Sequence, residues 1–313
     1  MKKTRVVIAL GGNALQQNGE VTAEAQKAVA EQIGATIARL SNKYEIIVAH
    51  GNGPQVGNIL IHEETAATPA APAMPLETAV AMSQGQIGYW LSQAIGNAFA
   101  KEHKRKKVVS VVTQVVVDKN DPAFKHPSKP IGQFYTAKEA VKLAKLKGWE
   151  MREDSGRGYR RVVASPKPLD IVERREITTL VESGAIVIAV GGGGIPVTRT
   201  KILKVLKGVD AVIDKDLAAE KLAELVKADI FVSVTAVPNA YLNYGQPDQI
   251  ALGLISPNEV ATYTKAGHFR AGSMLPKIKA AAAFAAQKKL GIITSPAQLE
   301  LSLARRAGTI VQG

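Results

Sequence analysis

The stretch EIIVAHGNGPQVG (residues 45–57) joins a short apolar run to a segment that contains three glycines. The same change occurs in VVIALGGNAL (residues 6–15) and in IVIAVGGGGIPV (residues 186–197). In each case an apolar run of strand length, rich in β-branched residues, precedes residues too small to build a core. Glycine lets backbone N–H groups approach an anion without interference from a Cβ atom. The three glycine breaks therefore predict anion-binding turns at the ends of buried strands.

Apolar runs alternate with helical patterns along most of the chain. The predicted strands are residues 5–10, 45–50, 107–117, 185–191, 229–235, 290–294 and 307–311. The predicted helices are residues 22–41, 76–103, 170–183, 215–227, 256–265, 274–289 and 296–304. Continuous apolar strands between helices predict an α/β fold with a mostly parallel sheet covered on both faces. Ligands of such sheets bind beyond the carboxyl ends of the strands, where the glycine breaks fall.

Residues 119–168, here called the insert, do not fit this alternation. They are polar, rich in proline and glycine, and contain HPSKPIGQFY (residues 126–135) and EDSGRGYRR (residues 153–161). Because the insert is too long for a simple crossover loop, we expect a small subdomain that is a candidate lid. Residues 200–214 are expected to form a hairpin.

The composition narrows the class of protein. The chain has 313 residues and no cysteine, which excludes disulfides and thiolate chemistry. The apolar run near its start is too short for a signal peptide, and no segment is long enough to span a membrane, so we expect a cytoplasmic protein. The net charge is +13, but the one dense basic cluster, KEHKRKK (residues 101–107), ends a predicted helix, where cations suit the helix dipole. Small polyanions are therefore favoured as partners over nucleic acid or membrane.

Three lysines accompany these segments. VIDKDLA (residues 212–218) places Asp214, Lys215 and Asp216 at a strand-to-helix junction, and GSMLPK (residues 272–277) places Lys277 at another helix start. A lysine near a helix N-terminus opposes the dipole, so we expect a compensating anion there. Lys129 lies in the insert, before a proline. The alternative for each is a solvated lysine whose stem packs on the protein.

Other polar residues have simpler interpretations. His50 ends a buried strand, where a hydrogen-bonded structural histidine is favoured over a catalytic base. Ser83, Gln84 and Gln86 belong to a predicted helix and are candidates for a subunit interface. The chain has neither the dinucleotide fingerprint nor a Walker-type phosphate loop, so a nucleotide would bind by another scheme.

Taken in order, nine segments resemble the signature motifs of the carbamate kinase family. They are ALGGNAL, HGNGPQVG, AMSQGQIGYWL, DKNDPAF, KPIGQFY, EDSGRGYRRVV, GGGGIPV, AVIDKDLA and GHFRAGSMLPK. The resemblance covers nearly the whole chain and implies a three-layer αβα sandwich, a homodimer, and phosphoryl transfer between ATP and carbamate. It also implies an N-terminal lobe (residues 1–198) that holds carbamate or carbamoyl phosphate. The insert would protrude from this lobe as a lid, and a C-terminal lobe (residues 199–313) would hold the nucleotide.

The family's functional residues can be placed on this sequence. The substrate-binding turns correspond to Gly11, Gly12 and Asn13, and to Gly51, Asn52 and Gly53; the nucleotide-side turn corresponds to Gly191, Gly192 and Gly193. Lys129 matches the insert lysine that reaches the transferred group. Lys215 and Lys277 match the pair that neutralises phosphates, and Asp214 matches the aspartate that orders the active-site lysines. In one departure, SVTAVPNAYLNYG (residues 233–245) has Ala236 and Pro238 in a turn near the adenine that is usually acidic.

The chemistry agrees with this residue set. Carbamate already carries a negative oxygen, so the reaction needs alignment and charge neutralisation rather than a general base. Mg²⁺ would bridge the nucleotide phosphates, mostly through water, because the motifs offer few carboxylates. The resemblance thus implies an ATP-dependent phosphotransferase with a carboxyl-group acceptor, run from carbamoyl phosphate and ADP towards ATP. The alternatives are an acyl-phosphate kinase for another small carboxylate, and a regulator that binds a nucleotide or carbamoyl phosphate without turnover.

Overall fold

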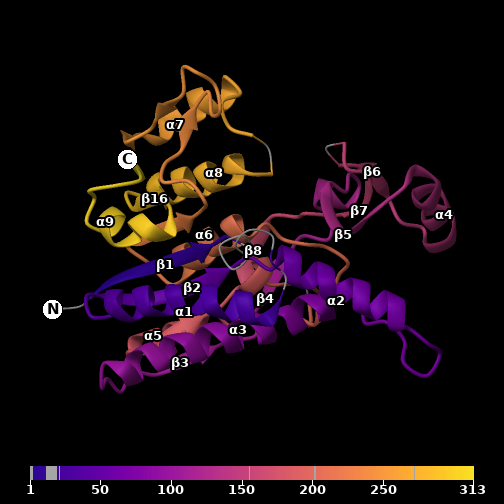
Figure 1. Cartoon of the computed structure of the whole chain (residues 1–313), viewed down its shortest axis with the longest axis horizontal. Coiled ribbons are helices and arrows are strands. Elements are labelled where there is room, and N and C mark those ends of the chain that lie inside the picture. The colour runs from indigo at the N-terminus through magenta and orange to yellow at the C-terminus, as the bar shows by residue number, and fades with distance from the viewer. Residues whose placement is uncertain (1–2, 12–19, 21, 155, 201, 271) are drawn as a thin grey trace.

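The computed structural model describes residues 3–11, 20, 22–154, 156–200, 202–270 and 272–313. Its centre is an eight-stranded sheet in the order β15-β17-β16-β12-β1-β2-β9-β3, in which only β16 and β17 pair antiparallel. The neighbours β1 and β2 run side by side in Figure 1. The strands are β15 (Leu254–Ile255), β17 (Thr309–Gln312), β16 (Leu290–Thr294), β12 (Ile230–Val234), β1 (Thr4–Leu10), β2 (Tyr44–His50), β9 (Ile186–Ile188) and β3 (Val108–Ser110). The predicted mostly parallel sheet is confirmed.

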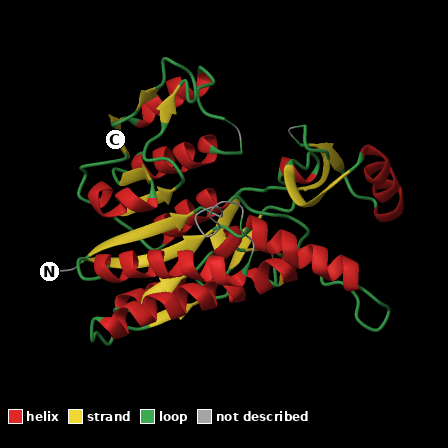
Figure 2. Ribbon diagram, viewed as in Figure 1, coloured by secondary structure: helices red, strands yellow, loops and turns green. Residues whose placement is uncertain are grey.

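Helices cover both faces of this sheet (Figure 2). Along β1, Val7 and Ala9 belong to one buried cluster, and Val6 and Ile8 belong to another. The first cluster includes side chains of α5 (Arg174–Glu182), α6 (Lys215–Leu225), α7 (Pro257–Lys265) and α8 (Met274–Ala285). The second includes side chains of α1 (Ala23–Leu40), α3 (Leu76–Lys101) and α9 (Leu299–Leu303). Because successive strand residues point to opposite faces, this division makes a three-layer αβα sandwich, as predicted.

Smaller sheets flank the central one. The first has the order β11-β10-β4-β8, with strands β11 (Leu206–Gly208), β10 (Ile195–Arg199), β4 (Gln114–Val117) and β8 (Pro168–Ile171). β10 and β11 form a hairpin, but β10 ends before residue 200, so the range expected for this hairpin (residues 200–214) was wrong. A second is a two-stranded ribbon of β13 (Tyr241–Leu242) and β14 (Ile250–Ala251), and a third, of three strands, belongs to the insert.

The insert forms a small body that projects beside α2 (Gly53–Ala66) in Figure 1. Its elements are the short helix Pro122–Phe124, β5 (Lys129–Tyr135), α4 (Ala137–Lys147), β6 (Met151–Glu153) and β7 (Tyr159–Val163). Thr136 and Glu139 make a reciprocal capping box at the start of α4, and Gly148 ends the helix with a left-handed φ of 67°. The predicted subdomain is therefore present.

Several predicted boundaries were wrong. Residues 107–117 form two strands, β3 and β4, because Thr113 bends the chain between two sheets: its N–H donates to Gln84 Oε1 and its hydroxyl accepts from the Val190 N–H. The glycine break after β2 starts a helix, α2, which was missed; a proline in the first turn suits a helix start. The helix predicted at 170–183 starts only at Arg174 because β8 occupies residues 168–171. The helix predicted at 296–304 is a 3₁₀ turn followed by α9.

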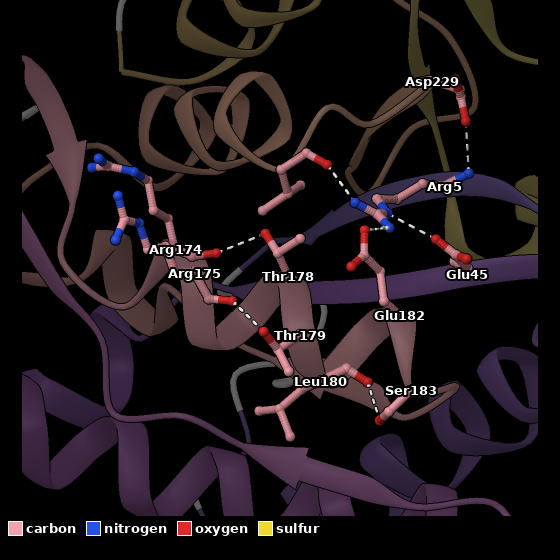
Figure 3. Close-up of polar contacts among 11 residues, drawn as sticks. Arg5, Glu45, Arg174, Arg175, Thr178, Thr179, Leu180, Glu182, Ser183 and Asp229 are labelled. Atoms are coloured by element: carbon pink, nitrogen blue, oxygen red, sulfur yellow. Dashed lines mark hydrogen bonds and ion pairs between the residues drawn. The ribbon is translucent and has the colours of Figure 1, made fainter.

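The two ends of the central sheet differ. At the end where β1 and β2 begin, the buried guanidinium of Arg5 binds Glu45 (2.8 Å), Glu182 (3.1 Å) and the carbonyl of Val226 (2.6 Å) (Figure 3). Asp229 accepts a bond from the Arg5 N–H at 2.8 Å. Because these bonds satisfy the buried charge of Arg5, that guanidinium is not free to bind a ligand at this end of the sheet. The carboxyl end of the strands is therefore the expected place for a site.

The two-lobe division stays a prediction. Strands from residues 4–188 and from residues 230–312 join in one continuous sheet, with β1 directly beside β12. Within the described ranges, no helix has the length and hydropathy that a bilayer crossing requires.

Candidate active site

A cavity of about 980 Å³ lies at the carboxyl edge of the sheet, between the main body and the insert. The parallel register places Leu10 of β1 opposite His50 of β2 and Val234 of β12, so the three strands end together. The residues that follow β2 line the cavity, together with residues from the insert and from the starts of α6 and α8.

Three helices begin at this cavity. Gly53 starts α2, Lys215 starts α6 and Ser273 precedes α8, and all three line the cavity. Helix starts carry unpaired N–H groups and a partial positive charge, which together favour anions. Among the described residues, neither Asn52 nor Ser273 caps its own helix through its side chain. Asn52 donates instead to Ser83 Oγ at 2.8 Å, so its side chain does not cover the start of α2.

Lys215 and Lys277 converge on one carboxylate, that of Asp216. Lys215 Nζ lies 3.0 Å from Oδ1, and Lys277 Nζ lies 2.8 Å from Oδ2. The buried hydroxyl of Ser233, at the end of β12, donates to Oδ1 at 2.7 Å. Both lysine side chains are 13% exposed and that of Asp216 is 3% exposed, so the two ammonium groups are held in place before any ligand arrives.

Burial changes the pKa values of these lysine and aspartate side chains. Burial lowers the pKa of Lys215 to about 8; the charge of Asp216 opposes this shift and the charge of Lys277 adds to it. Burial would raise the pKa of Asp216, but the two ammonium groups outweigh it and hold that pKa well below its usual range. A phosphate bound here would meet two cations that share a single negative charge.

Lys129 reaches the same cavity from the insert. Its Nζ lies 3.1 Å from Oδ2 of Asp214, whose Oδ1 caps α6 by accepting the Asp216 N–H at 2.9 Å. Asp214 therefore holds Lys129, while Asp216 orders the other two lysines. The resemblance had implied that Asp214 orders the active-site lysines, and the structure divides that role between two aspartates.

The third glycine turn packs onto the second. Gly192 has a left-handed φ of 66°, and a Cβ atom there would lie 2.1 Å from Asn52 Nδ2. A Cβ atom on Gly191 would lie 2.5 Å from His50 Nε2. Gln84 donates to the carbonyl of Gly191 at 3.0 Å and so fixes the turn. Only glycine allows this approach, and it brings the turns after β2 and β9 together.

This packing corrects one expectation and supports another. Ser83 and Gln84 are buried inside the chain, where they hold the glycine turns, and so the proposal that they face a subunit interface was wrong. His50 is buried, and its Nδ1 lies 3.0 Å from the carbonyl of Gly51. Burial lowers its pKa to about 4, so the ring is neutral and structural.

The structure gathers most of the predicted site residues. Those that line the cavity are Gly51, Asn52, Gly53, Lys129, Gly192, Asp214, Lys215 and Lys277. Gly11 directly follows β1, but the described lining does not include it. The lining does not include Gly191 or Gly193 either, whose backbones pack against His50 and Ile213. Gly12 and Asn13 lie outside the described residues.

Sequence reasoning missed the contribution of the insert's aromatic and arginine residues. Arg157 and Arg160 lie over the ring of Phe134, with 4.7 and 5.1 Å between Cζ and the ring centroid, and all three line the cavity. Its described lining thus carries five cations and two carboxylates. The signal was the arginine-rich motif EDSGRGYRR, read only as part of the insert. The arrangement suits a polyanion and supplies positive charge from opposite sides.

A second cavity, of about 520 Å³, shares Ser273 with the first. Its lining is partly aromatic and includes Tyr241, Tyr244, Phe269 and Met274. Ala236, one of the two departures from the family pattern, also lies in this lining. A ligand with a flat apolar part and an anionic part could therefore extend across both cavities.

Known proteins resemble this chain over nearly its full length. A sequence profile of the Amino acid kinase family matches residues 4–295. A carbamate kinase of Thermococcus kodakarensis is 53% identical over 286 residues (90% of each chain), and carbamate kinase 2 of Enterococcus faecalis is 51% identical over 308 residues (97% of each). The solved structure of carbamate kinase from Giardia lamblia bound to AMP-PNP has a TM-score of 0.93 and 44% identity, covering 99% of this chain and 98% of that one.

Proposed function

Because the chain belongs to the amino acid kinase family, and within it to the carbamate kinases, we propose that its large cavity transfers a phosphoryl group between carbamate and ADP. One observation carries this assignment of the site. Lys129, Lys215 and Lys277 come from three separate parts of the chain and line a single cavity together with three helix starts. The reaction is reversible, and we propose carbamoyl phosphate and ADP as the reactants from which the chain makes ATP and carbamate.

The residues suit the demands of this transfer. The carbamate oxygen is already anionic, so a neutral, buried His50 is no obstacle. The charge on the transferred phosphoryl oxygens must be neutralised and the reactants must be aligned. Lys215 and Lys277 would bind the nucleotide phosphates, Lys129 would approach the transferred group, and the start of α2 would bind the carbamoyl end. The insert would act as a lid that excludes water.

The nucleotide base fits the second cavity. The related structure from Giardia lamblia is described as bound to AMP-PNP, a nucleotide analogue. We propose that adenine lies among Tyr241, Tyr244 and Phe269, with its phosphates passing Ser273 towards Lys277. Ala236 leaves room there and offers no carboxylate, so contact with the ribose would come from other groups.

Mg²⁺ is best placed on the nucleotide rather than on the protein. Within the described residues there is no group of three or more His, Cys, Asp or Glu side chains that could hold a metal ion. The two carboxylates in the cavity lining, Asp214 and Asp216, are each bound by lysine. We propose that the ion would enter with ATP or ADP and would supply charge neutralisation at the phosphates, beside Lys215 and Lys277.

We also propose a homodimer that forms through α3. Met82 and Tyr89 lie seven residues apart on one side of this helix and are 43% and 55% exposed. Sedimentation should give about twice the 33.2 kDa chain mass, and a Tyr89→Glu variant should shift towards the monomer. A wild-type monomer at micromolar concentration would contradict this assembly.

A coupled assay of ATP formation tests the proposed reaction. Carbamoyl phosphate and ADP should give ATP, and acetyl phosphate should give far less at the same concentration. Preference for acetyl phosphate would indicate another acyl-phosphate kinase. Binding of carbamoyl phosphate without any ATP formation would indicate a regulator.

A further inference from the structure

The insert touches the main body at a second place, outside the cavity. Lys147 Nζ lies 3.9 Å from Oε2 of Glu64, and an Arg161 guanidinium nitrogen lies 2.5 Å from Oδ2 of Asp210. The ring of Trp149 lies beside both cations, with its centroid 4.3 Å from Lys147 Nζ and 4.7 Å from Arg161 Cζ. We call these five residues the Trp149 cluster. We propose that the cluster positions the insert so that Lys129 meets the transferred group, an inference that rests on the proposed function.

Both ion pairs cross from the insert to the main body. Lys147, Trp149 and Arg161 belong to α4, the following turn and β7, all within the insert. Glu64 belongs to α2, and Asp210 lies between β11 and α6. Because Trp149 lies against both cations, a movement of the insert would disturb the two pairs together.

The cluster is coupled to Lys129 through two short segments. In the β5–β7 ladder, Ile131 is opposite Arg161 and Lys129 is opposite Val163. On the main body, Asp210 and Asp214 are four residues apart. The pairs Arg161–Asp210 and Lys129–Asp214 therefore join the same two parts of the chain.

A backbone contact lies between these two pairs. The Val212 N–H donates to the carbonyl of Ala164 at 2.9 Å, and Ala164 and Ala211 form a parallel bridge. This contact holds the base of the insert close to the segment that leads to Asp214. Loss of the outer pair, Arg161–Asp210, would let the insert turn about this base and move Lys129 away from Asp214.

The base of the insert also has apolar support that does not depend on the cluster. Ile131 and Val163 are buried in a group with Val56, Leu60 and Leu76 from α2 and α3. The cluster itself is more open, since the Arg161 side chain is 16% exposed and that of Asp210 is 58% exposed. Partly exposed ion pairs are weak and can break and re-form. We therefore expect a change at the cluster to alter the orientation of the insert and leave it folded.

Arg161→Met tests this role, and Arg152→Met is its matched control. Arg152 is also an insert arginine in an ion pair, but its partner is Glu150, which belongs to the insert as well. Arg161→Met should lower kcat by about threefold to tenfold, as expected for one lost ion pair and cation–π contact. The KM for ADP should stay within about twofold, because Lys215 and Lys277 are untouched. Arg152→Met should keep the wild-type kcat.

Two further variants separate positioning from a general loss of structure. Arg161→Lys keeps the charge and should restore much of the lost kcat. Asp210→Asn should lower kcat by a similar factor, and the double variant Arg161→Met/Asp210→Asn should be no worse than either single one, because both remove the same contact. Additive losses, or an Arg161→Met kcat equal to that of Arg152→Met, would overturn the proposal.

Trp149 supplies a readout that does not need enzyme activity. The chain has two tryptophans, and the other, Trp90, is buried in α3. In a Trp90→Phe background, acrylamide should quench Trp149 more strongly when Arg161→Met is added, and no more strongly when Arg152→Met is added. Unchanged quenching with Arg161→Met would overturn the proposed role of the cluster. If the two variants differ in quenching as expected but the wild type makes no ATP, only the proposed function is overturned.

Discussion

Lys129 Nζ lies 3.1 Å from Oδ2 of Asp214, although the two residues are 85 positions apart in the chain. The other carboxylate oxygen of Asp214 accepts the Asp216 N–H and so caps α6. One side chain therefore joins the insert to the start of the helix that carries Lys215. The position of the insert lysine and the order of this helix start depend on the same residue.

Asp214→Asn and Asp214→Ala should separate these two tasks. Asparagine is as good an N-cap as aspartate but lacks the charge that holds Lys129. The melting temperature of the Asp214→Asn variant should therefore stay near that of the wild type. Its kcat should fall about tenfold, since a hydrogen bond to a charged group contributes about 1.5 kcal/mol. The Asp214→Ala variant should show the same loss of kcat, and its free energy of unfolding should also fall by about 1 kcal/mol because alanine cannot cap α6. Thermal denaturation and the coupled assay measure both effects; an Asn variant with full kcat would show that the contact has no part in catalysis.

Gly53→Val should remove ligand binding without disturbing the fold. A Cβ atom at Gly53 would meet no described atom within 4 Å, so the added bulk enters the cavity rather than the core. We expect calorimetry to show carbamoyl phosphate affinity reduced by at least about tenfold, because the start of α2 would be covered. Gly253→Val, between β14 and β15, is the control, since its Cβ atom is equally free of described neighbours and lies outside the described cavity lining. Undiminished binding by Gly53→Val would remove the start of α2 from the site.

The affinity for ADP should fall above pH 8. Burial lowers the pKa of Lys215 to about 8 in the free protein, so its ammonium group loses its proton as the pH rises through that value. The phosphates of ADP are already ionised there, and an anion binds the protonated lysine, so affinity should decrease by up to about tenfold per pH unit. Titration calorimetry from pH 7 to 9.5 measures this slope. Lys215→Arg should flatten it because arginine stays charged; an equally flat wild-type profile would contradict the assignment.

Local patterns were enough to predict the sheet and the edge that carries the site. The glycine breaks after β1, β2 and β9 follow apolar runs, and parallel strands that end together bring such breaks to one edge. The lysines were predictable as a set because each stands at a helix start or in the insert. Their partners were not predictable: in DKD (residues 214–216) either aspartate could face Lys277, and the choice depends on where α8 packs.

Features that depend on distant contacts were missed. The bend between β3 and β4 follows from bonds that Thr113 makes to Gln84 and Val190, which no local pattern reveals. The helix α2 was hidden because its first residues are glycine and proline, which also mark turns. The Trp149 cluster needs residues from α2, the insert and the segment after β11, and it becomes visible only when the chain is folded.

The kcat of Lys129→Ala, measured beside its dissociation constant for ADP, tests the central claim most directly. If Lys129 stabilises charge on the transferred phosphoryl group, kcat should fall by about 10²–10³ while the affinity for ADP changes by less than about threefold. Lys277→Ala is the comparison: it should weaken ADP binding as well, because Lys277 would contact the nucleotide phosphates in the ground state. Retention by Lys129→Ala of more than about a tenth of the wild-type kcat, a loss well below that of a charge-stabilising donor, would contradict the account.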